Sequence, residues 1–325
     1  MTSQPVLSVV LPVHNGAKYL RESMASVLAQ TERAFEFIVW DDGSGDESRE
    51  IAASFSDPRI VRFANEKNLG LFPTLNRALA AARCDRIRLW SQDDVMEPNC
   101  LERETAYFSR FDGWGMGYCY YHVIDDRGRV CLRRPQVKEA RLIPSDWAAE
   151  IMFFHGSLTG NIANMTLRRD VLRKLGGFDE GYRYAGDFDL IERISARYPI
   201  CCIYEPLLLL RQHQGQFSRK HRAYLDSIEE GEQIQQRLRR RLSLRQEYVE
   251  RYDSWARGVQ DAHYAFRLSL HGDLSGYKLL RRQSRLGRSA LWWLLTANRR
   301  LYQMPRKYSP ELAEHMAWEP KWLSH

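Results

Sequence analysis

The first hundred residues alternate short runs of β-branched and apolar side chains with stretches whose apolar residues recur at helical spacing. The first run, Leu7 to Val13, is almost continuously apolar, as in a strand that is buried on both faces. Helical patterns separate it from three further strand-like runs, at residues 35–40, 60–63 and 87–90. Strands and helices in strict alternation predict a mainly parallel, Rossmann-like α/β sheet with helices on both faces.

Two pairs of aspartates follow strands of this predicted sheet. Asp41 and Asp42 come after the second strand, and Asp93 and Asp94 come after the fourth. Ligands of such sheets bind beyond the carboxyl ends of the strands. Two adjacent carboxylates repel each other unless a cation or several donors compensate, and Mg²⁺ or Mn²⁺ is held by one or two carboxylates together with substrate phosphates. The second pair therefore favours a divalent-metal site over a solvated turn.

The first pair leaves two interpretations open. A carboxylate at Asp41 or Asp42 could accept a hydrogen bond from the ring N–H of uracil or thymine. The residues that follow, Gly43 and Ser44, are equally typical of a simple turn. The residues alone do not choose between base binding and turn formation.

The alternation continues to about residue 218 and then stops. We expect a hairpin over residues 113–130, a strand over 160–167, a helix over 187–198 and a strand over 200–210. Beyond Arg219 the pattern becomes long, arginine-rich and helical. The sequence therefore predicts an α/β domain over residues 1–218 and a basic α-helical region over residues 219–325.

Seven segments of the first region, in their order along the chain, resemble the inverting family 2 glycosyltransferases with a GT-A fold. They are LPVHNG, WDDGSGDES, NEKNLG, WSQDDV, GGFDE, AGDFDLIER and LRQHQGQFS. The resemblance covers residues 7–218 and rests on the order and spacing of the segments rather than on any single motif. It implies a nucleotide-diphospho-sugar transferase fold, a catalytic domain over residues 1–218, and transfer of a sugar from its nucleotide donor to an acceptor hydroxyl.

The resemblance implies a nucleotide-binding role for a set of residues at the ends of the predicted strands. These are Pro12, His14, Asn15, Asp41, Asp42, Asn68, Gly70 and Arg77. Within the first aspartate pair, Asp42 is the residue implied to contact the base.

The resemblance also implies a metal centre that holds Mn²⁺ or Mg²⁺. Asp94 is implied as a metal ligand, and Asp93 as the acid that contacts the ribose or the donor sugar. The order Gln92-Asp93-Asp94 departs from a strict Asp-x-Asp motif, so the division of roles between the two acids stays open. His213 is implied to approach the metal or the diphosphate, and Arg211 to neutralise the leaving group.

Asp187 matches the acid that serves as general base in this family. Transfer with inversion needs a group that removes the proton of the acceptor as the new bond forms. A carboxylate at a helix N-terminus is expected to keep a low pKa and to be ionised. Many relatives have Glu-Asp here, whereas this chain has Gly186 before the acid, and Asp189 is the alternative base.

The net charge of +7 is concentrated beyond Arg219. Such a charge suits nucleic acid, an anionic membrane or a phosphorylated substrate, and the absence of a nucleic-acid-binding motif argues against the first. Apolar residues recur at helical spacing over residues 222–242 and 248–270, and a Trp-Leu cluster lies between arginines over 284–302. These patterns fit either a packed helical subdomain or helices that contact the membrane surface peripherally.

Several sequence patterns that are absent bear on the predicted location and function. The sequence has no apolar run of roughly 18 residues, no signal-peptide pattern and no paired cysteine spacing, which predicts a cytoplasmic protein that could lie on the inner face of the membrane. No GxGxxG follows the first strand, which argues against a dinucleotide-dependent dehydrogenase. We expect an inverting, metal-dependent transferase that uses a UDP- or dTDP-sugar and a glycan or lipid-linked acceptor in surface-polysaccharide biosynthesis. The alternative is a catalytically silent nucleotide-sugar-binding or scaffold module.

Overall fold

The structure is a computed structural model that describes residues 4–213, 215 and 221–242, the side chains of 221–229 excepted. The chain divides into two compact units, Met1–Arg241 and Leu242–His325. All described residues except Leu242 belong to the first unit. The predicted helices over 248–270 and 284–302 lie outside the described residues. Within the described part of the chain, no helix combines the length and apolarity needed to cross a membrane.

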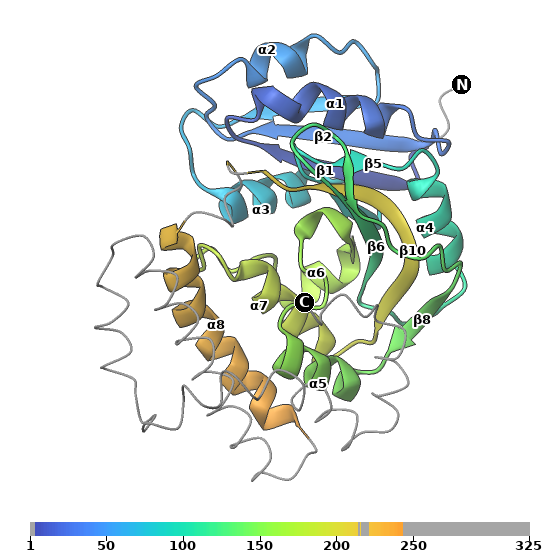
Figure 1. The fold of residues 1–325 in the computed structure, drawn as a ribbon, viewed down its shortest axis with the longest axis vertical. Helices are drawn as coiled ribbons and strands as arrows, with labels where there is room; N and C mark the ends of the chain where they lie inside the picture. Colours follow the sequence, from blue (N-terminus) through green and yellow to red (C-terminus); the bar gives the residue numbers. More distant parts are fainter. Residues whose placement is uncertain (1–3, 214, 216–220, 243–325) are drawn as a thin grey trace. The chain divides into compact units, whose positions relative to one another are not determined.

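The first four strands form the parallel half of one ten-stranded sheet (Figure 1). They are β1 (Leu7–Val13), β2 (Phe35–Asp41), β3 (Ile60–Ala64) and β4 (Arg86–Leu89). They lie side by side in the order β3, β2, β1, β4, and each neighbouring pair is parallel. This order, in which the chain returns to the other side of β1, places the loops after β1 and β4 at a switch point where ligands bind. The predicted parallel α/β sheet is confirmed.

The second half of the sheet is mixed. Strand β9 (Met165–Arg168) runs antiparallel between β4 and β6 (Met116–Ile124), and β6 pairs in parallel with β10 (Ile200–Arg211). Short strands extend this half: β7 (Val130–Leu132) closes the predicted hairpin with β6, while β5 (Val95–Met96) and β8 (Ala140–Ile143) pair with β10. The predicted strand over 160–167 forms only in its second part, because a 3-10 turn at Ile162–Asn164 precedes it.

Helices cover both faces of the parallel strands. Helices α1 (Ala17–Leu28) and α2 (Ser48–Ala53) lie on one side, and α3 (Leu71–Ala81) lies on the other (Figure 1). Four more helices follow: α4 (Cys100–Phe108), α5 (Ser145–His155), α6 (Arg169–Leu175) and α7 (Gly186–Ser195).

The last described helix, α8 (His221–Arg241), packs against α5 and α7. It confirms the helical pattern predicted over 222–242. It belongs to the first compact unit, which therefore continues past Arg219 to Arg241.

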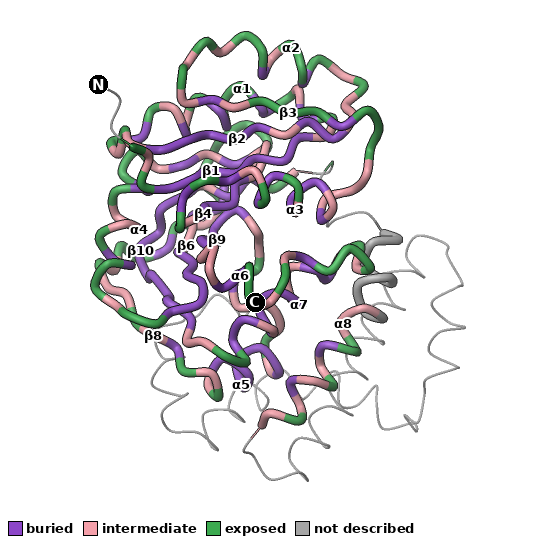
Figure 2. The backbone as a smooth tube through the Cα atoms, turned by 180° about the vertical axis from the view of Figure 1, so that it is seen from behind, coloured by how far each residue is buried: buried purple, intermediate pink, exposed green. Residues whose placement is uncertain are grey.

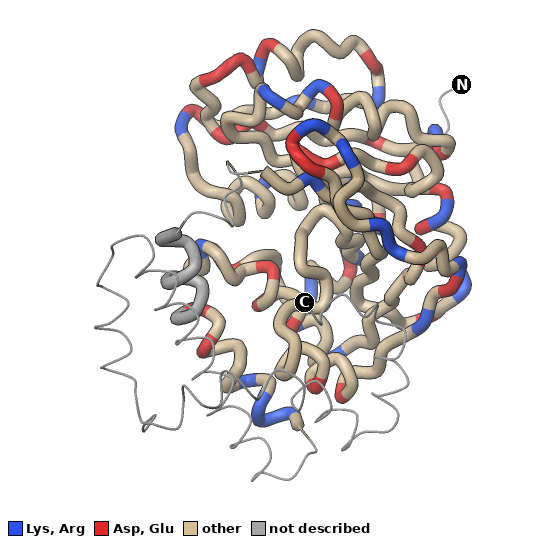
Figure 3. Tube along the Cα trace, viewed as in Figure 1, with Lys and Arg blue, Asp and Glu red and all other residues tan. Residues whose placement is uncertain are grey.

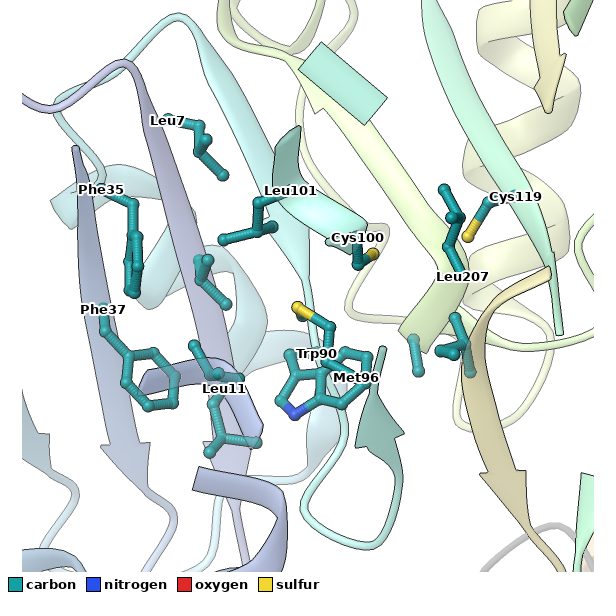
Figure 4. Close-up of a cluster of buried hydrophobic side chains, with 14 of the residues drawn as sticks. Leu7, Leu11, Phe35, Phe37, Trp90, Met96, Cys100, Leu101, Cys119 and Leu207 are labelled. Atoms are coloured by element: carbon teal, nitrogen blue, oxygen red, sulfur yellow. The ribbon is translucent and has the colours of Figure 1, made fainter. Parts of the chain in front are cut away.

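The main core lies against the parallel strands and extends under β10. Figure 4 shows Leu11 and Phe37 from neighbouring strands packed near Trp90, with Met96 and Leu101 beside them. All five are at most 2% exposed, and Figure 2 shows β1, β2 and β10 as almost entirely buried. Because these side chains fill the sheet surface, the strand ends are held at fixed positions relative to one another.

A buried ion pair joins the two halves of the sheet. Arg88 of β4 and Glu104 of α4 approach to 3.1 Å, with side chains 0% and 4% exposed. Arg88 also donates to the backbone oxygens of Ala163 and Met165, and Thr166 donates its hydroxyl to Glu104 at 2.9 Å. The pair therefore connects α4 with β4 and β9, where the parallel half of the sheet meets the mixed half.

Candidate active site

A cleft of about 1340 Å³ lies at the carboxyl ends of the parallel strands. The loops after β1, β3 and β4 form much of its lining, together with residues 180–183, Gln212, His213 and Gly215. Eight predicted site residues line it: Pro12, His14, Asn15, Asp42, Asn68, Gly70, Asp93 and His213. The other five, Asp41, Arg77, Asp94, Asp187 and Arg211, do not belong to this lining.

His14 connects the loops after β1, β2 and β3. Its Nε2 lies 2.7 Å from Nδ2 of Asn68, and its Nδ1 lies 2.9 Å from the backbone oxygen of Asp42. Because an amide NH₂ only donates, the neutral ring would carry its proton on Nδ1 and donate it to that oxygen. The imidazole is thereby held in one orientation on the wall of the cleft.

Asp42 organises the loop that carries Asn68 and Gly70. Its carboxylate, 3% exposed, accepts hydrogen bonds from Nδ2 of Asn65 at 2.8 Å and from the backbone N–H groups of Leu69 and Gly70 at 2.8 and 2.9 Å. Gly70 has φ +97°, a conformation that glycine adopts without strain. Both oxygens of Asp42 are therefore engaged, and a base N–H would have to share one of them.

Asp41 and Arg77 serve the fold beside this loop. Asp41 Oδ2 accepts from Arg49 Nε at 2.6 Å and from the backbone N–H of Ser44 at 3.1 Å, which is the turn chemistry that the sequence left open. Arg77 donates to Oδ1 of Asn65 at 2.8 Å and is exposed. Neither side chain lies on the lining of the cleft.

Asp93 and His213 come together at the other end of the cleft. His213 Nε2 lies 3.1 Å from Asp93 Oδ2, and both side chains are partly exposed, at 16% and 17%. Ser91 donates its hydroxyl to the second oxygen of Asp93. An imidazole nitrogen and a carboxylate oxygen this close can both reach one divalent cation, whose remaining positions would be open to phosphate oxygens. In the described residues no group of three or more acidic, His or Cys side chains could hold a metal.

Asp94 lies differently from its neighbour. It is 1% exposed, and its Oδ1 accepts the backbone N–H of Arg211 at 2.8 Å. Burial, and next the charge of Asp93, raise the pKa of Asp94 well above its usual value, which favours the neutral form. The structure therefore presents Asp93, and not Asp94, to the cleft.

Arg211 is committed to the protein interior. Its guanidinium donates to the backbone oxygens of Asp93 and Asp125 at 2.9 and 3.1 Å and to the carboxylate of Glu22 at 2.6 Å. It is 2% exposed and packs over the ring of Tyr19. Two other cations, Lys18 and Arg183, line the cleft instead. The sequence offered no signal for them, because surface lysines and arginines are common throughout this chain.

Gln92 is a further residue that the sequence analysis did not single out. Its side-chain amide accepts from the backbone N–H of His14 at 2.9 Å and donates to the backbone oxygen of His14 at 3.2 Å. This pair of hydrogen bonds ties the loop after β4 to the loop after β1. The only available signal was its position directly before Asp93.

Asp187 lies in the first turn of α7 and is half-buried. Burial raises the pKa of Asp187 to about 6, against the smaller lowering effect of the backbone N–H groups of Phe188 and of Asp187 itself. The expectation of a low pKa at this helix N-terminus was wrong, because the cost of desolvation exceeds the stabilisation that the helix end provides.

The alternative base, Asp189, has a structural role. It is 2% exposed and forms ion pairs with Arg193 at 2.7 Å and with Arg237 at 2.5 Å. Both of its carboxylate oxygens accept hydrogen bonds from these arginines, and Asp189 does not belong to the lining of the cleft.

Gly186 departs from the expected Glu-Asp for a steric reason. A Cβ at this position would lie 2.6 Å from Cε2 of Phe72, and that ring is stacked on Phe178 at a centroid distance of 5.2 Å. The glycine therefore lets α7 approach α3 closely.

Gly186→Ala is expected to lower the free energy of unfolding by about 1 to 3 kcal/mol, the usual cost of overpacking. Gly45→Ala is the matched control, because no atom of the described residues lies within 4 Å of a Cβ at that position, and a change within about 0.5 kcal/mol is expected. Urea unfolding of both variants gives the comparison. Equal effects of the two substitutions would contradict the steric explanation.

The chain is similar in sequence to known glycosyltransferases. The chain matches the model of Glycosyl transferase family 2 over residues 8–176. It is 30% identical over 234 residues to an uncharacterized glycosyltransferase of Rickettsia prowazekii, covering 71% of this chain and 70% of that protein. It is 29% identical over 252 residues to the putative glycosyltransferase EpsE of Bacillus subtilis, covering 74% of this chain and 84% of that protein. It spans only 36% of an uncharacterized glycosyltransferase of Rickettsia felis.

Two solved structures of S. aureus TarS 1-349 share the fold. The complex of TarS with UDP-GlcNAc superposes with a TM-score of 0.60 over 91% of this chain and 80% of that chain. The complex with UDP superposes with a TM-score of 0.56 over 76% of this chain and 69% of that chain. Sequence identity is 16% in both cases, so the likeness concerns the fold.

Proposed function

Because this chain belongs to glycosyl transferase family 2, we propose that its cleft binds a nucleotide-diphosphate sugar, with UDP- or dTDP-sugars favoured, and that the sugar passes to a hydroxyl group of an acceptor. The observation that carries the proposal is the arrangement of the strand ends, where His14 and Asn68 lie at one wall of the cleft and Asp93 and His213 at another. S. aureus TarS, which has this fold, was solved with UDP and with UDP-GlcNAc, and this supports a uridine donor.

The nucleoside is proposed to bind at the wall formed by Pro12, His14, Asn15, Asn68 and Gly70. Asn15 has φ +48°, a left-handed conformation that asparagine tolerates better than most residues, and its Oδ1 accepts the N–H of Gly45 at 2.8 Å. Together with the clamp of Asp42 on the loop after β3, this contact holds the wall in place before a ligand arrives. A wall held in this way reduces the ordering cost of binding.

The diphosphate is proposed to bind at the other end, where Asp93 and His213 would hold Mn²⁺ or Mg²⁺. The two side chains fit such an ion, because one carboxylate and one imidazole leave room for phosphate oxygens. A bound ion would offset the negative charge that develops on the departing diphosphate. Lys18, which lines the same cleft, adds positive charge for the same purpose.

Asp187 is proposed as the general base that removes the proton of the acceptor hydroxyl. It follows residues 180–183 of the cleft lining and lies at the N-terminus of α7. With a pKa of about 6 it is mostly ionised at pH 7 and still basic enough to accept a proton. One in-line displacement, with the base opposite the leaving group, inverts the anomeric carbon.

A glycan or lipid-linked acceptor in surface-polysaccharide biosynthesis remains our proposal for the biological substrate. Peripheral contact with a membrane would depend mainly on the region after Arg241. In α8, Arg237 and Arg241 are paired with acids of α7, although Figure 3 shows basic residues gathered at its C-terminal end.

The alternative of a catalytically silent module was based on Gly186, which stands where many relatives have an acid. The close packing of Phe72 offers a steric reason for that glycine, so Gly186 does not by itself favour the alternative.

Calorimetric titration with UDP, dTDP and GDP tests the proposal. We expect UDP or dTDP to bind the native chain more tightly with Mn²⁺ than without it, by roughly tenfold or more. Asp93→Asn should remove this dependence on Mn²⁺. Asp94→Asn is the matched control, since a buried amide can still accept the N–H of Arg211, and it should keep the dependence.

Two outcomes would contradict the assignment. Loss of the Mn²⁺ effect in Asp94→Asn but not in Asp93→Asn would reverse the roles of the two acids. Failure of the native chain to bind any of the three nucleotides would favour the scaffold alternative.

A further inference from the structure

The carboxylate of Glu230, on α8, accepts hydrogen bonds from three consecutive backbone N–H groups. Arg183 donates to Oε1 at 2.8 Å, and Tyr184 and Ala185 donate to Oε2 at 2.8 and 2.7 Å. These three residues lead directly into α7, whose N-cap is Ala185. One side chain thus fixes the short segment between the lining of the cleft and Asp187.

Glu230 lies on the face of α8 that packs against the rest of the unit. Ile234 and Leu238, one and two turns further along, are both 0% exposed. On the same face, Arg237 forms ion pairs with Asp189 at 2.5 Å and with Glu192 at 2.8 Å. Glu230 of α8 therefore lies at the N-terminal end of α7, where a negative charge is favourable. Arg237 of α8 pairs with two acids of α7, so charges of opposite sign face each other between the two helices.

We propose that Glu230 is a positioning residue for the transfer step, because it holds residues 183–185 and thereby sets where Asp187 lies relative to the cleft. The inference rests on the proposed role of Asp187. Glu230 lies well outside residues 8–176, the part that matches the family model. A segment of the chain beyond that match therefore completes the site.

Both carboxylate oxygens of Glu230 take part in this contact, Oε1 with one N–H group and Oε2 with two. Glutamine has the same size, but its NH₂ group cannot accept a hydrogen bond. In Glu230→Gln one side-chain oxygen remains for three N–H donors, so the segment at 183–185 loses part of its anchorage. A shift of the base of about 1 Å is enough to slow a positioned proton transfer strongly.

Nucleotide binding should respond differently. The proposed nucleoside wall and the pair of Asp93 and His213 come from the loops after β1, β3, β4 and β10, and the hydrogen bonds that shape them do not involve α8. Loss of the Glu230 contact should therefore reduce transfer while UDP binding continues.

The test uses the full chain and the variants Glu230→Gln and Arg241→Gln. Arg241 is the matched control, because it also anchors α8, through Glu192 and the backbone oxygen of Ser145, and none of the described residues to which it donates lines the cleft. UDP titration counts functional binding sites, and UDP release from UDP-glucose, UDP-galactose and UDP-GlcNAc gives the turnover per site. Hydrogen exchange at the amides of 183–185 reports on the contact itself.

For Glu230→Gln we expect a UDP affinity within about twofold of the native value, a roughly 10- to 100-fold lower turnover per site, and faster exchange at 183–185. Arg241→Gln should keep the native turnover per site. Native turnover in Glu230→Gln, unchanged exchange, or a parallel loss of UDP binding would each overturn the positioning role. If the native chain itself binds UDP but releases none from any sugar, the proposed function fails and the positioning role fails with it, while the exchange data still show whether Glu230 holds the segment.

Discussion

Asp187→Asn is expected to lower the rate of sugar transfer by about 10² to 10⁴-fold, the usual contribution of a general base. The amide keeps the size of the side chain and cannot take a proton from the acceptor. UDP affinity should stay at the native value, because Asp187 does not line the cleft where the nucleotide is proposed to bind. Rates and UDP affinities measured on the same preparations give the comparison.

The pH dependence of transfer checks the same residue independently. The base acts in its ionised form, and the pKa of Asp187 is raised to about 6. The native rate should therefore fall tenfold per pH unit below about pH 6 and level off above it. In Asp187→Asn this acid limb should disappear from the residual rate.

Stability should change in the opposite direction to activity. Folding raises the pKa of Asp187 from 3.8 to about 6, so the folded state favours the protonated form. Stability therefore falls as the pH rises between these two values, and the full cost remains above about pH 6. Asp187→Asn removes that cost and should be at least as stable as the native chain at neutral pH. A variant with native activity and an intact acid limb would show that another group is the base.

The second large effect concerns the buried pair of Arg88 and Glu104. Glu104→Gln is expected to lower the free energy of unfolding by about 3 to 5 kcal/mol, because it leaves the fully buried guanidinium of Arg88 without its counter-charge. Urea unfolding at neutral pH measures the loss. Glu102→Gln is the control on the same helix: Glu102 is exposed, and a change within about 0.5 kcal/mol is expected.

A double variant separates charge burial from packing. Replacing both partners, as in Arg88→Met with Glu104→Leu, removes the two buried charges together, and such exchanges are often close to neutral. The double variant should therefore be more stable than Glu104→Gln alone. A loss below about 1 kcal/mol in Glu104→Gln would contradict the view that the pair joins the two halves of the sheet.

The parallel half of the fold was predictable because its information is local. Each strand and helix up to Leu89 follows from periodicity within its own residues, and parallel order fixes where the strand ends meet. Helix α5 was missed because residues 148–153 are buried in an unbroken run, which leaves no polar stripe to mark a helix. The short strands β5 and β8 were missed because each depends on β10, which lies more than fifty residues away in the sequence.

The site was predictable in location but not in its details. Nothing in the order of residues distinguishes the side-chain directions of Asp93 and Asp94. In the structure Asp94 is buried and accepts the backbone N–H of Arg211, which lies 117 residues away in the sequence. Similarly, the pKa of Asp187 depends on burial by distant residues, which overrides the local effect of the helix end. Glu230 accepts the backbone N–H of Ala185, which lies 45 residues earlier in the sequence. No local pattern around either residue predicts a contact over that separation.

The most direct test of the central claim is a time course of proton NMR spectra with the native chain, diamagnetic Mg²⁺ and an α-linked UDP-sugar, with UDP-GlcNAc, UDP-glucose and UDP-galactose each tried in turn. Water serves as the acceptor, so both the release of UDP and the anomer of the freed sugar are visible before mutarotation mixes the two forms. An inverting transferase with Asp187 as base predicts that the β-anomer appears first, together with UDP. Appearance of the α-anomer first, together with UDP, would contradict it.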